Sequence, residues 1–221
     1  MMKIFYTPDH EKHDPPYEGY NDEGNMPSFE KALRAKIVRT ALLKKHWAEF
    51  KSPSNFGIEP IIAVHSKTYL DYLQSAYLEW QGYSPVKGMA FIPGTFSIDY
   101  QQARLLRGNE QTGFFLMDTT VAITPGTFTA ALHAAYCALS GAQALANGEK
   151  ATFSITRPPG HHAGKEICGG YCYLNNAAIA AQWLSQTGKI AILDVDYHAG
   201  NGTQQIFYQN PNVLTVSLHA D

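Results

Sequence analysis

The chain has 221 residues, 45% of them hydrophobic and 16% charged, so it is long enough for one substantial core and shows no low-complexity segment. A formal charge of −2 excludes a strongly basic surface, and we expect neither a nucleic-acid partner nor binding to a membrane. The absence of a signal-peptide pattern and of a run of roughly 18 apolar residues predicts a cytoplasmic protein. The three cysteines, Cys137, Cys168 and Cys172, are expected to be reduced.

The N-terminal part predicts a strand, a loop and a helix in that order. Residues 3–8 form a short apolar run that ends at a proline, which favours a strand, and the polar, acidic residues 9–27 favour a loop. Residues 29–47 carry Leu33 and Ile37 at helical spacing, with Lys and Arg opposite them, which indicates an amphipathic helix.

Two further helices are predicted before the middle of the chain. Residues 65–80 repeat the helical pattern with Ser66 as N-cap, and the alanine-rich residues 124–148 end at an Asn-Gly stop. Residues 81–123 between them are irregular. Because so long a segment without secondary structure is uncommon within one domain, we expect an elaborated loop with a function.

The second half of the chain alternates strands and helices. Residues 151–156, 189–196 and 212–219 read as strands, and residues 175–188 read as a helix. This alternation predicts a mainly parallel sheet covered by helices on both faces. In such folds ligands bind beyond the carboxyl ends of the strands.

Polar side chains follow two of these predicted strands. The stretch LDVDYHAGNGT places Asp196 and His198 after one strand, and a carboxylate with an imidazole suits zinc. The stretch RPPGHHAG places His161 and His162 after another, where two imidazoles suit acid and base work near pH 7. Each motif alone also fits an ordinary hydrogen-bonding or surface histidine, but both are expected to meet at one edge of the sheet.

Taken together, four motifs identify a family resemblance. They are RPPGHHAG, GGYCYLNNAAIAAQ, ILDVDYHAGNGTQQIFY and VSLHAD, in this order. This set resembles the zinc-dependent histone deacetylase superfamily, and within it the bacterial acetylpolyamine amidohydrolases are most similar. The resemblance implies an arginase/deacetylase-like three-layer α/β fold, and the hydrolysis of small acetylated amines, such as acetylated polyamines or acetyl-lysine, to acetate and the free amine.

The resemblance implies Asp196 and His198 as zinc ligands. The related two-metal arginases use a further aspartate at the position of Gly200, so a single zinc is expected here. Relatives usually carry a second histidine at Ala199, and this departure affects packing more than metal binding. The family takes its third zinc ligand and an oxyanion-stabilising tyrosine from later motifs, which do not occur before Asp221. We therefore expect residues 1–221 to form a single, incomplete domain, truncated at the C-terminus.

The same resemblance implies the acid and base residues. His161 and His162 match the tandem active-site histidines, with Asp194 orienting His161 and Asn201 behind His162. A carboxylate behind one ring favours its imidazolium form more than an amide behind the other, so the two rings can take different roles. We expect His162 to be the principal base.

A structural monovalent cation, K⁺ or Na⁺, is also implied. In the family pattern it is bound around five residues, which here are Asp194, Asp196, His198, Ser217 and Leu218. Two cations would neutralise acids that follow a buried strand.

Substrate contacts are implied at three places. Gly170 and Tyr171 match the position that lines the substrate tunnel. A loop insertion at 82–113 is associated in the family with a homodimer, and acidic residues around it would select cationic substrates. The candidates for that charge are Glu110, Glu18, Asp22 and Glu23, each of which also fits an ordinary solvated loop acid.

One other function class stays open beside the amidohydrolase. A non-catalytic remnant of the fold would keep these residues and bind a cation or a partner. Nucleotide binding at GNGT is disfavoured because the chain contains neither a Gly-x-Gly-x-x-Gly motif nor a Walker lysine.

Overall fold

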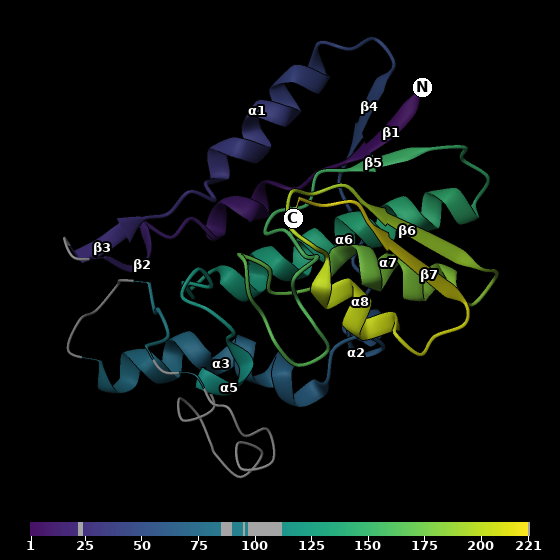
Figure 1. The fold of residues 1–221 in the computed structure, drawn as a ribbon. Helices are drawn as coiled ribbons and strands as arrows, with labels where there is room; N and C mark the ends of the chain where they lie inside the picture. Colours follow the sequence, from purple (N-terminus) through teal and green to yellow (C-terminus); the bar gives the residue numbers. More distant parts are fainter. Residues whose placement is uncertain (22–23, 85–89, 95, 97–111, 221) are drawn as a thin grey trace.

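The structure is a computed structural model that describes residues 1–21, 24–84, 90–94, 96 and 112–220 (Figure 1). The strands are β1 Met2–Phe5, β2 Tyr17–Asn21, β3 Gly24–Pro27, β4 Ala48–Lys51, β5 Thr152–Ser154, β6 Ile190–Asp194 and β7 Val213–Ser217. The helices are η1 Pro8–Lys12, α1 Ala32–Leu43, α2 Glu59–Ile62, α3 Lys67–Tyr83, α5 Thr112–Phe115, α6 Thr127–Ala146, α7 Asn176–Leu184 and α8 Asn201–Phe207.

The predicted parallel pairing is confirmed, and the parallel strands fall into two sheets. One has the order β4-β1-β5 and the other pairs β6 with β7, both with parallel ladders, whereas β2 and β3 form an antiparallel hairpin. Among the residues that the structure describes, β5 has a ladder with β1 and β6 has one with β7, but β5 and β6 do not pair. The α/β class predicted from the alternating elements is correct.

The three-stranded sheet lies between two helical layers because its side chains alternate in direction. Ile4 of β1 packs with Ala35 of α1 on one face, and the next residue, Phe5, packs with Cys137 of α6 on the other. All three cysteines are free and buried, as expected for reduced thiols. The sheet therefore forms the middle of the predicted three layers.

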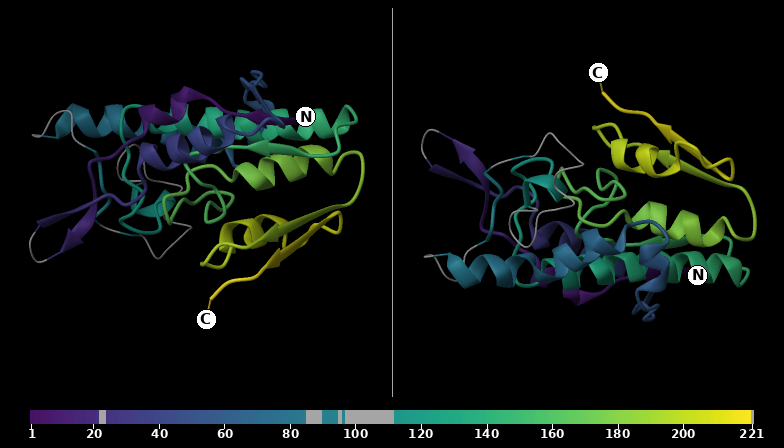
Figure 2. Two further views of the ribbon diagram at one scale, coloured as in Figure 1. Left: turned by 90° about the horizontal axis from the view of Figure 1, so that it is seen from above. Right: turned by 90° about the horizontal axis from the view of Figure 1, so that it is seen from below.

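Helix α7 lies between α6 and the β6–β7 pair (Figure 2). Ile190 and Ile192 of β6 point toward this core, whereas Leu193, Leu214 and Val216 on the opposite face of the pair are exposed. The alternation that buries one face thus leaves the other face apolar and uncovered in the described part of the chain.

The loop predicted for residues 9–27 is wrong in part, because this segment contains most of η1 and the β2–β3 hairpin. Thr7 caps η1 by accepting a hydrogen bond from the Asp9 N–H. The hairpin departs from regular alternation at Gly19, which has a φ of +61° beside a register shift, and Gly24 has a φ of +115°. These positive φ angles suit glycine. Strands β2 and β3 were missed because their short sequences lack the alternation of apolar residues that predicts a strand.

The helix predicted for residues 29–47 is shorter than expected and buries another face. It ends at Leu43, and the chain then turns into β4. Leu33 and Ile37 remain 61% and 59% exposed, whereas Ala32 and Ala35 are buried. The small alanine side chains allow α1 to approach the sheet closely, so helical spacing alone misidentified its buried face.

The remaining helices agree more closely with the sequence. Ser66 caps α3 by accepting a hydrogen bond from the Tyr69 N–H, α6 lies within the predicted 124–148, and α7 ends four residues before Gly188. Helices α2, α5 and α8 and strand β4 were not predicted. In the described residues no helix is long and apolar enough to cross a membrane.

Some predictions fall on residues that the structure does not describe. The insertion at 82–113 lies largely outside the described residues, and so do Glu110, Asp22 and Glu23. The single, incomplete domain over residues 1–221 stays a prediction.

Candidate active site

Two stretches of the chain meet at the carboxyl ends of β5 and β6. One carries His161 and His162, and the other carries Asp194. His161 Nδ1 lies 2.9 Å from Asp194 Oδ2, and both side chains are mostly buried, with 18% and 16% exposed. The other carboxylate oxygen, Asp194 Oδ1, accepts a hydrogen bond from the Asp196 N–H. Asp194 therefore links the loop after β5, residues 157–164, called here the histidine loop, to the turn after β6.

The second histidine has a different partner. His162 Nδ1 lies 2.6 Å from Asn201 Oδ1, at the first residue of α8. An amide oxygen only accepts hydrogen bonds, so Nδ1 of His162 is the donor in this contact. The rings of His161 and His162 lie with centroids 4.0 Å apart. Both contacts expected for the tandem histidines are present.

Asp196 and His198 lie in the turn after β6 and contact each other. The His198 N–H donates to Asp196 Oδ1 at 2.9 Å, and His198 Nδ1 lies 3.4 Å from the same oxygen. His161 Nε2 is 3.7 Å from this oxygen. Burial raises the pKa of Asp196, but the hydrogen bond from His198 and the neighbouring imidazoles outweigh it and leave the pKa below its ordinary value. Asp196 is therefore a carboxylate at neutral pH.

The donor atoms suit zinc, although the set is incomplete. A carboxylate oxygen and an imidazole nitrogen are ligands that zinc accepts, and a catalytic zinc usually takes three protein ligands. Within the ranges that the structure describes, no three His, Cys, Asp or Glu side chains form a metal-binding group. Asp196 and His198 thus provide two donors that fit the metal.

Gly170 and Tyr171 form a tight turn against His162. Both have positive φ, 51° and 66°, and a Cβ atom on Gly170 would overlap the imidazole carbon Cδ2 of His162. Tyr171 donates its hydroxyl to Glu18 Oε1 at 2.6 Å. Burial, and then the hydrogen bond to this carboxylate, raise the pKa of Tyr171. Glu18, one of the candidate acids, is therefore buried beside the candidate substrate position.

Asp118 and Thr120 support this turn and were not predicted. Asp118 Oδ2 accepts a hydrogen bond from the Gly170 N–H at 2.8 Å, and Thr120 Oγ1 accepts one from the Tyr171 N–H at 3.2 Å. Thr120 in turn donates to Asp118 Oδ1. The stretch Asp-Thr-Thr favours such a local turn, but its contact with Gly170 lies some fifty residues away and leaves no signal in the sequence.

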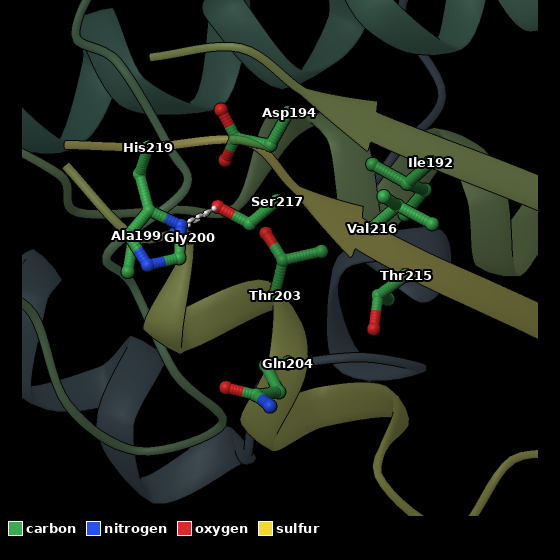
Figure 3. Close-up of a pocket in the computed structure, with 10 residues that line it drawn as sticks. All are labelled: Ile192, Asp194, Ala199, Gly200, Thr203, Gln204, Thr215, Val216, Ser217 and His219. Carbon is green, nitrogen blue, oxygen red and sulfur yellow. Dashed lines mark hydrogen bonds between the residues drawn. The ribbon is translucent and has the colours of Figure 1, made fainter. Parts of the chain in front are cut away.

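A pocket of about 160 Å³ lies beside Asp194 (Figure 3). Ser217 Oγ lies 3.0 Å from His219 Nδ1 on its wall and accepts a hydrogen bond from the Gly200 N–H. The Leu218 N–H donates to the carbonyl of Asp194 at 2.9 Å. The structure therefore brings Asp194, Ser217 and Leu218 together, as expected for the monovalent-cation residues, and cation binding stays a prediction.

Comparison with solved structures places the chain in the α/β class of deacetylase domains. It superposes on the acetylpolyamine aminohydrolase of Burkholderia pseudomallei with a TM-score of 0.92 and 36% identity, covering 100% of this chain and 64% of that one. The HDA15 HD domain superposes with a TM-score of 0.72 and 25% identity, over 99% of this chain and 53% of that domain's chain.

The sequence comparison identifies the family. The histone deacetylase domain matches residues 28–221, and the chain therefore belongs to that family. It is 41% identical over 223 residues to the acetylpolyamine amidohydrolase of Mycoplana ramosa, and 41% identical over 228 residues to acetylpolyamine amidohydrolase 2 of Pseudomonas aeruginosa. In both cases the match covers 100% of this chain and 64% of the relative, so the chain spans just under two thirds of their length.

Proposed function

We propose that this protein is a zinc-dependent amidohydrolase that removes acetyl groups from acetylated polyamines or related small acetylated amines. The observation that carries the proposal is the pair of adjacent imidazoles with unlike partners, a carboxylate behind His161 and an amide behind His162, facing Asp196 and His198. The names of the similar amidohydrolases support the substrate class.

The residues of the site would have different roles, either in binding the metal or in transferring a proton. Asp196 and His198 would hold zinc, which when bound polarises a carbonyl and lowers the pKa of water from about 15.7 toward about 7. His162 accepts the proton of the attacking water at Nε2, because Nδ1 already donates to Asn201. His161, oriented by Asp194, provides the second imidazole.

Other parts of the site would bind the substrate and a second cation. The backbone of Gly170 and the ring of Tyr171 would line the path of the acetylated amine, and the buried carboxylate of Glu18 would favour a cationic substrate. K⁺ or Na⁺ would bind near Asp194 and Ser217. Selection by Glu110, and a homodimer formed through residues 82–113, stay predictions; a monomeric mass by light scattering would contradict the dimer.

The test of the proposed function is acetate release from an acetylated polyamine, with zinc measured on the same sample. A form of the protein extended to the length of its relatives should turn over the substrate, and its His162→Ala variant should keep zinc and lose turnover. The 221-residue chain by itself should show no appreciable turnover, because a catalytic zinc usually takes three protein ligands and only Asp196 and His198 are identified among the described residues.

Two results would count against these expectations. Turnover of the isolated chain comparable to that of a relative would mean that the third ligand comes from an unidentified residue. A zinc-loaded extended form that releases no acetate from any small acetylated amine would instead favour the non-catalytic alternative.

A further inference from the structure

A buried asparagine joins the three segments that form the candidate active site. Asn175 is 0% exposed, and its side-chain amide makes three hydrogen bonds. Oδ1 accepts from the Ala178 N–H at 3.0 Å and caps α7, whereas Nδ2 donates to the carbonyl of Ala163 and to Thr203 Oγ1, each at 3.0 Å. The cap needs only the oxygen, and the two donated bonds connect the start of α7 to the histidine loop and to α8.

Both donated bonds end beside the paired groups His162 and Asn201. Ala163 directly follows His162 in the histidine loop, and Thr203 lies two residues after Asn201 in α8. The Thr203 N–H also donates to the carbonyl of His161 at 3.1 Å. The amide of Asn175 therefore holds the loop and the helix at the separation where His162 Nδ1 reaches Asn201 Oδ1.

Asn175 is itself held in a rigid environment. His65, 0% exposed, accepts a hydrogen bond from the Asn175 N–H at its Nε2 at a distance of 2.9 Å. Asn176 Nδ2 donates to the carbonyl of Pro158, and a Cβ on Gly160 would lie 2.6 Å from the Asn176 nitrogen, so the histidine loop packs directly on the start of α7. A fixed donor can determine the position of the groups that it binds.

We propose that Asn175 is a positioning residue that fixes the tautomer of His162. By keeping Asn201 Oδ1 against His162 Nδ1, it places the proton on Nδ1 and leaves Nε2 as the nitrogen without a proton, in a ring whose centroid lies 5.8 Å from that of His198. This inference deepens the proposed function, because it rests on His162 acting there as the base, but the tautomer itself can be measured without turnover.

The decisive variant is Asn175→Asp, whose carboxylate retains the capping oxygen and the volume of the side chain but places an acceptor oxygen against the Ala163 carbonyl where the amide has an N–H donor. The ring nitrogens of His162 would be observed by NMR of the ¹⁵N-histidine-labelled 221-residue chain, with His162→Ala to assign its signals among the 9 histidines. We expect wild type to show one Nδ1–H tautomer, and Asn175→Asp to show a mixture of tautomers, as Asn201→Ala should.

A matched control separates positioning from a general loss of stability. Ser66→Ala removes the corresponding cap of α3, where Ser66 Oγ accepts from the Tyr69 N–H, and it retains the backbone hydrogen bond from the Ser66 N–H to the carbonyl of Lys165 beside the histidine loop. It should lower the thermal midpoint without changing the tautomer of His162. If Asn175→Asp does not fold, Thr203→Val, which removes one acceptor of the same amide at similar volume, takes its place and should shift the tautomer in the same direction.

The proposal is overturned if a folded Asn175→Asp or Thr203→Val variant keeps a pure Nδ1–H tautomer while Asn201→Ala gives a mixture. In a form that turns over substrate, Asn175→Asp should lower kcat by about 100-fold, the size expected for a displacement of about 1 Å. This loss should largely disappear in an Asn201→Ala background. A tautomer change without any turnover in wild type would contradict the proposed function and leave the positioning role intact.

Discussion

The buried ion pair between Arg157 and Glu30 anchors the start of the histidine loop, and its removal should destabilise the protein strongly. Both side chains are almost fully buried, at 3% and 5% exposed, with Arg157 Nε 2.8 Å from Glu30 Oε2. Arg157 also donates to the carbonyls of His10 and His13. Arg157→Met keeps the apolar stem but leaves the buried Glu30 carboxylate with only the exposed Arg34 guanidinium nearby. We expect a loss of about 3–5 kcal/mol in the free energy of unfolding.

A control on the same carboxylate tests this reasoning. Arg34 NH1 lies 3.9 Å from Glu30 Oε1, but the Arg34 side chain is 66% exposed. Such a surface pair contributes about 0–1 kcal/mol, so Arg34→Met should be nearly neutral. Urea unfolding of both variants at pH 7, followed by circular dichroism, measures the difference. A cost below about 1 kcal/mol for Arg157→Met, or one equal to that of Arg34→Met, would refute the argument.

The pH dependence gives a second check on the same pair. Burial raises the pKa of Glu30, and the nearby Arg157 opposes this shift. Without Arg157 the pKa in the folded state should rise further. A carboxyl group with a raised pKa in the folded state stabilises the fold below its unfolded pKa, and this contribution is lost as the pH rises through the folded pKa. The cost of Arg157→Met should therefore shrink as the pH falls from 7 toward 5.

Three further predictions concern the site and the exposed sheet face. In a form that binds zinc stoichiometrically, Asp196→Ala and His198→Ala should each lose the metal, whereas His162→Ala should retain it. Mass spectrometry measures the zinc content. The reverse pattern would show that the ligand and the base are misassigned. Gly170→Ala places a Cβ against the His162 ring at a φ of 51°, so we expect about 100-fold lower kcat at unchanged zinc content, and normal activity would contradict the tight contact. The isolated chain should self-associate through the exposed face of β6–β7, and Leu214→Lys, at a position 61% exposed, should lower its mass in light scattering; an unchanged mass would rule this face out.

The sequence by itself determined the features that depend on neighbouring residues. The apolar runs that became β6 and β7 and the Ser66 cap of α3 follow from side-chain periodicity and short-range hydrogen bonding. The pairing of His161 with Asp194 and of His162 with Asn201 was expected from the family resemblance, and the structure contains both contacts. Their roles in catalysis stay predictions.

Only the tertiary structure decided which distant groups complete the site. Asn175 bonds to Thr203, Gly170 to Asp118, and Arg157 to Glu30 across 28, 52 and 127 positions of the chain. A buried polar group must find a partner, but its own sequence neighbourhood does not say which one, because the partner is set by how the helices and strands pack. The same holds for α1, whose larger apolar side chains stay exposed while its alanines meet the sheet. Burial depends on the surface that faces a helix, and that surface exists only once the chain has folded.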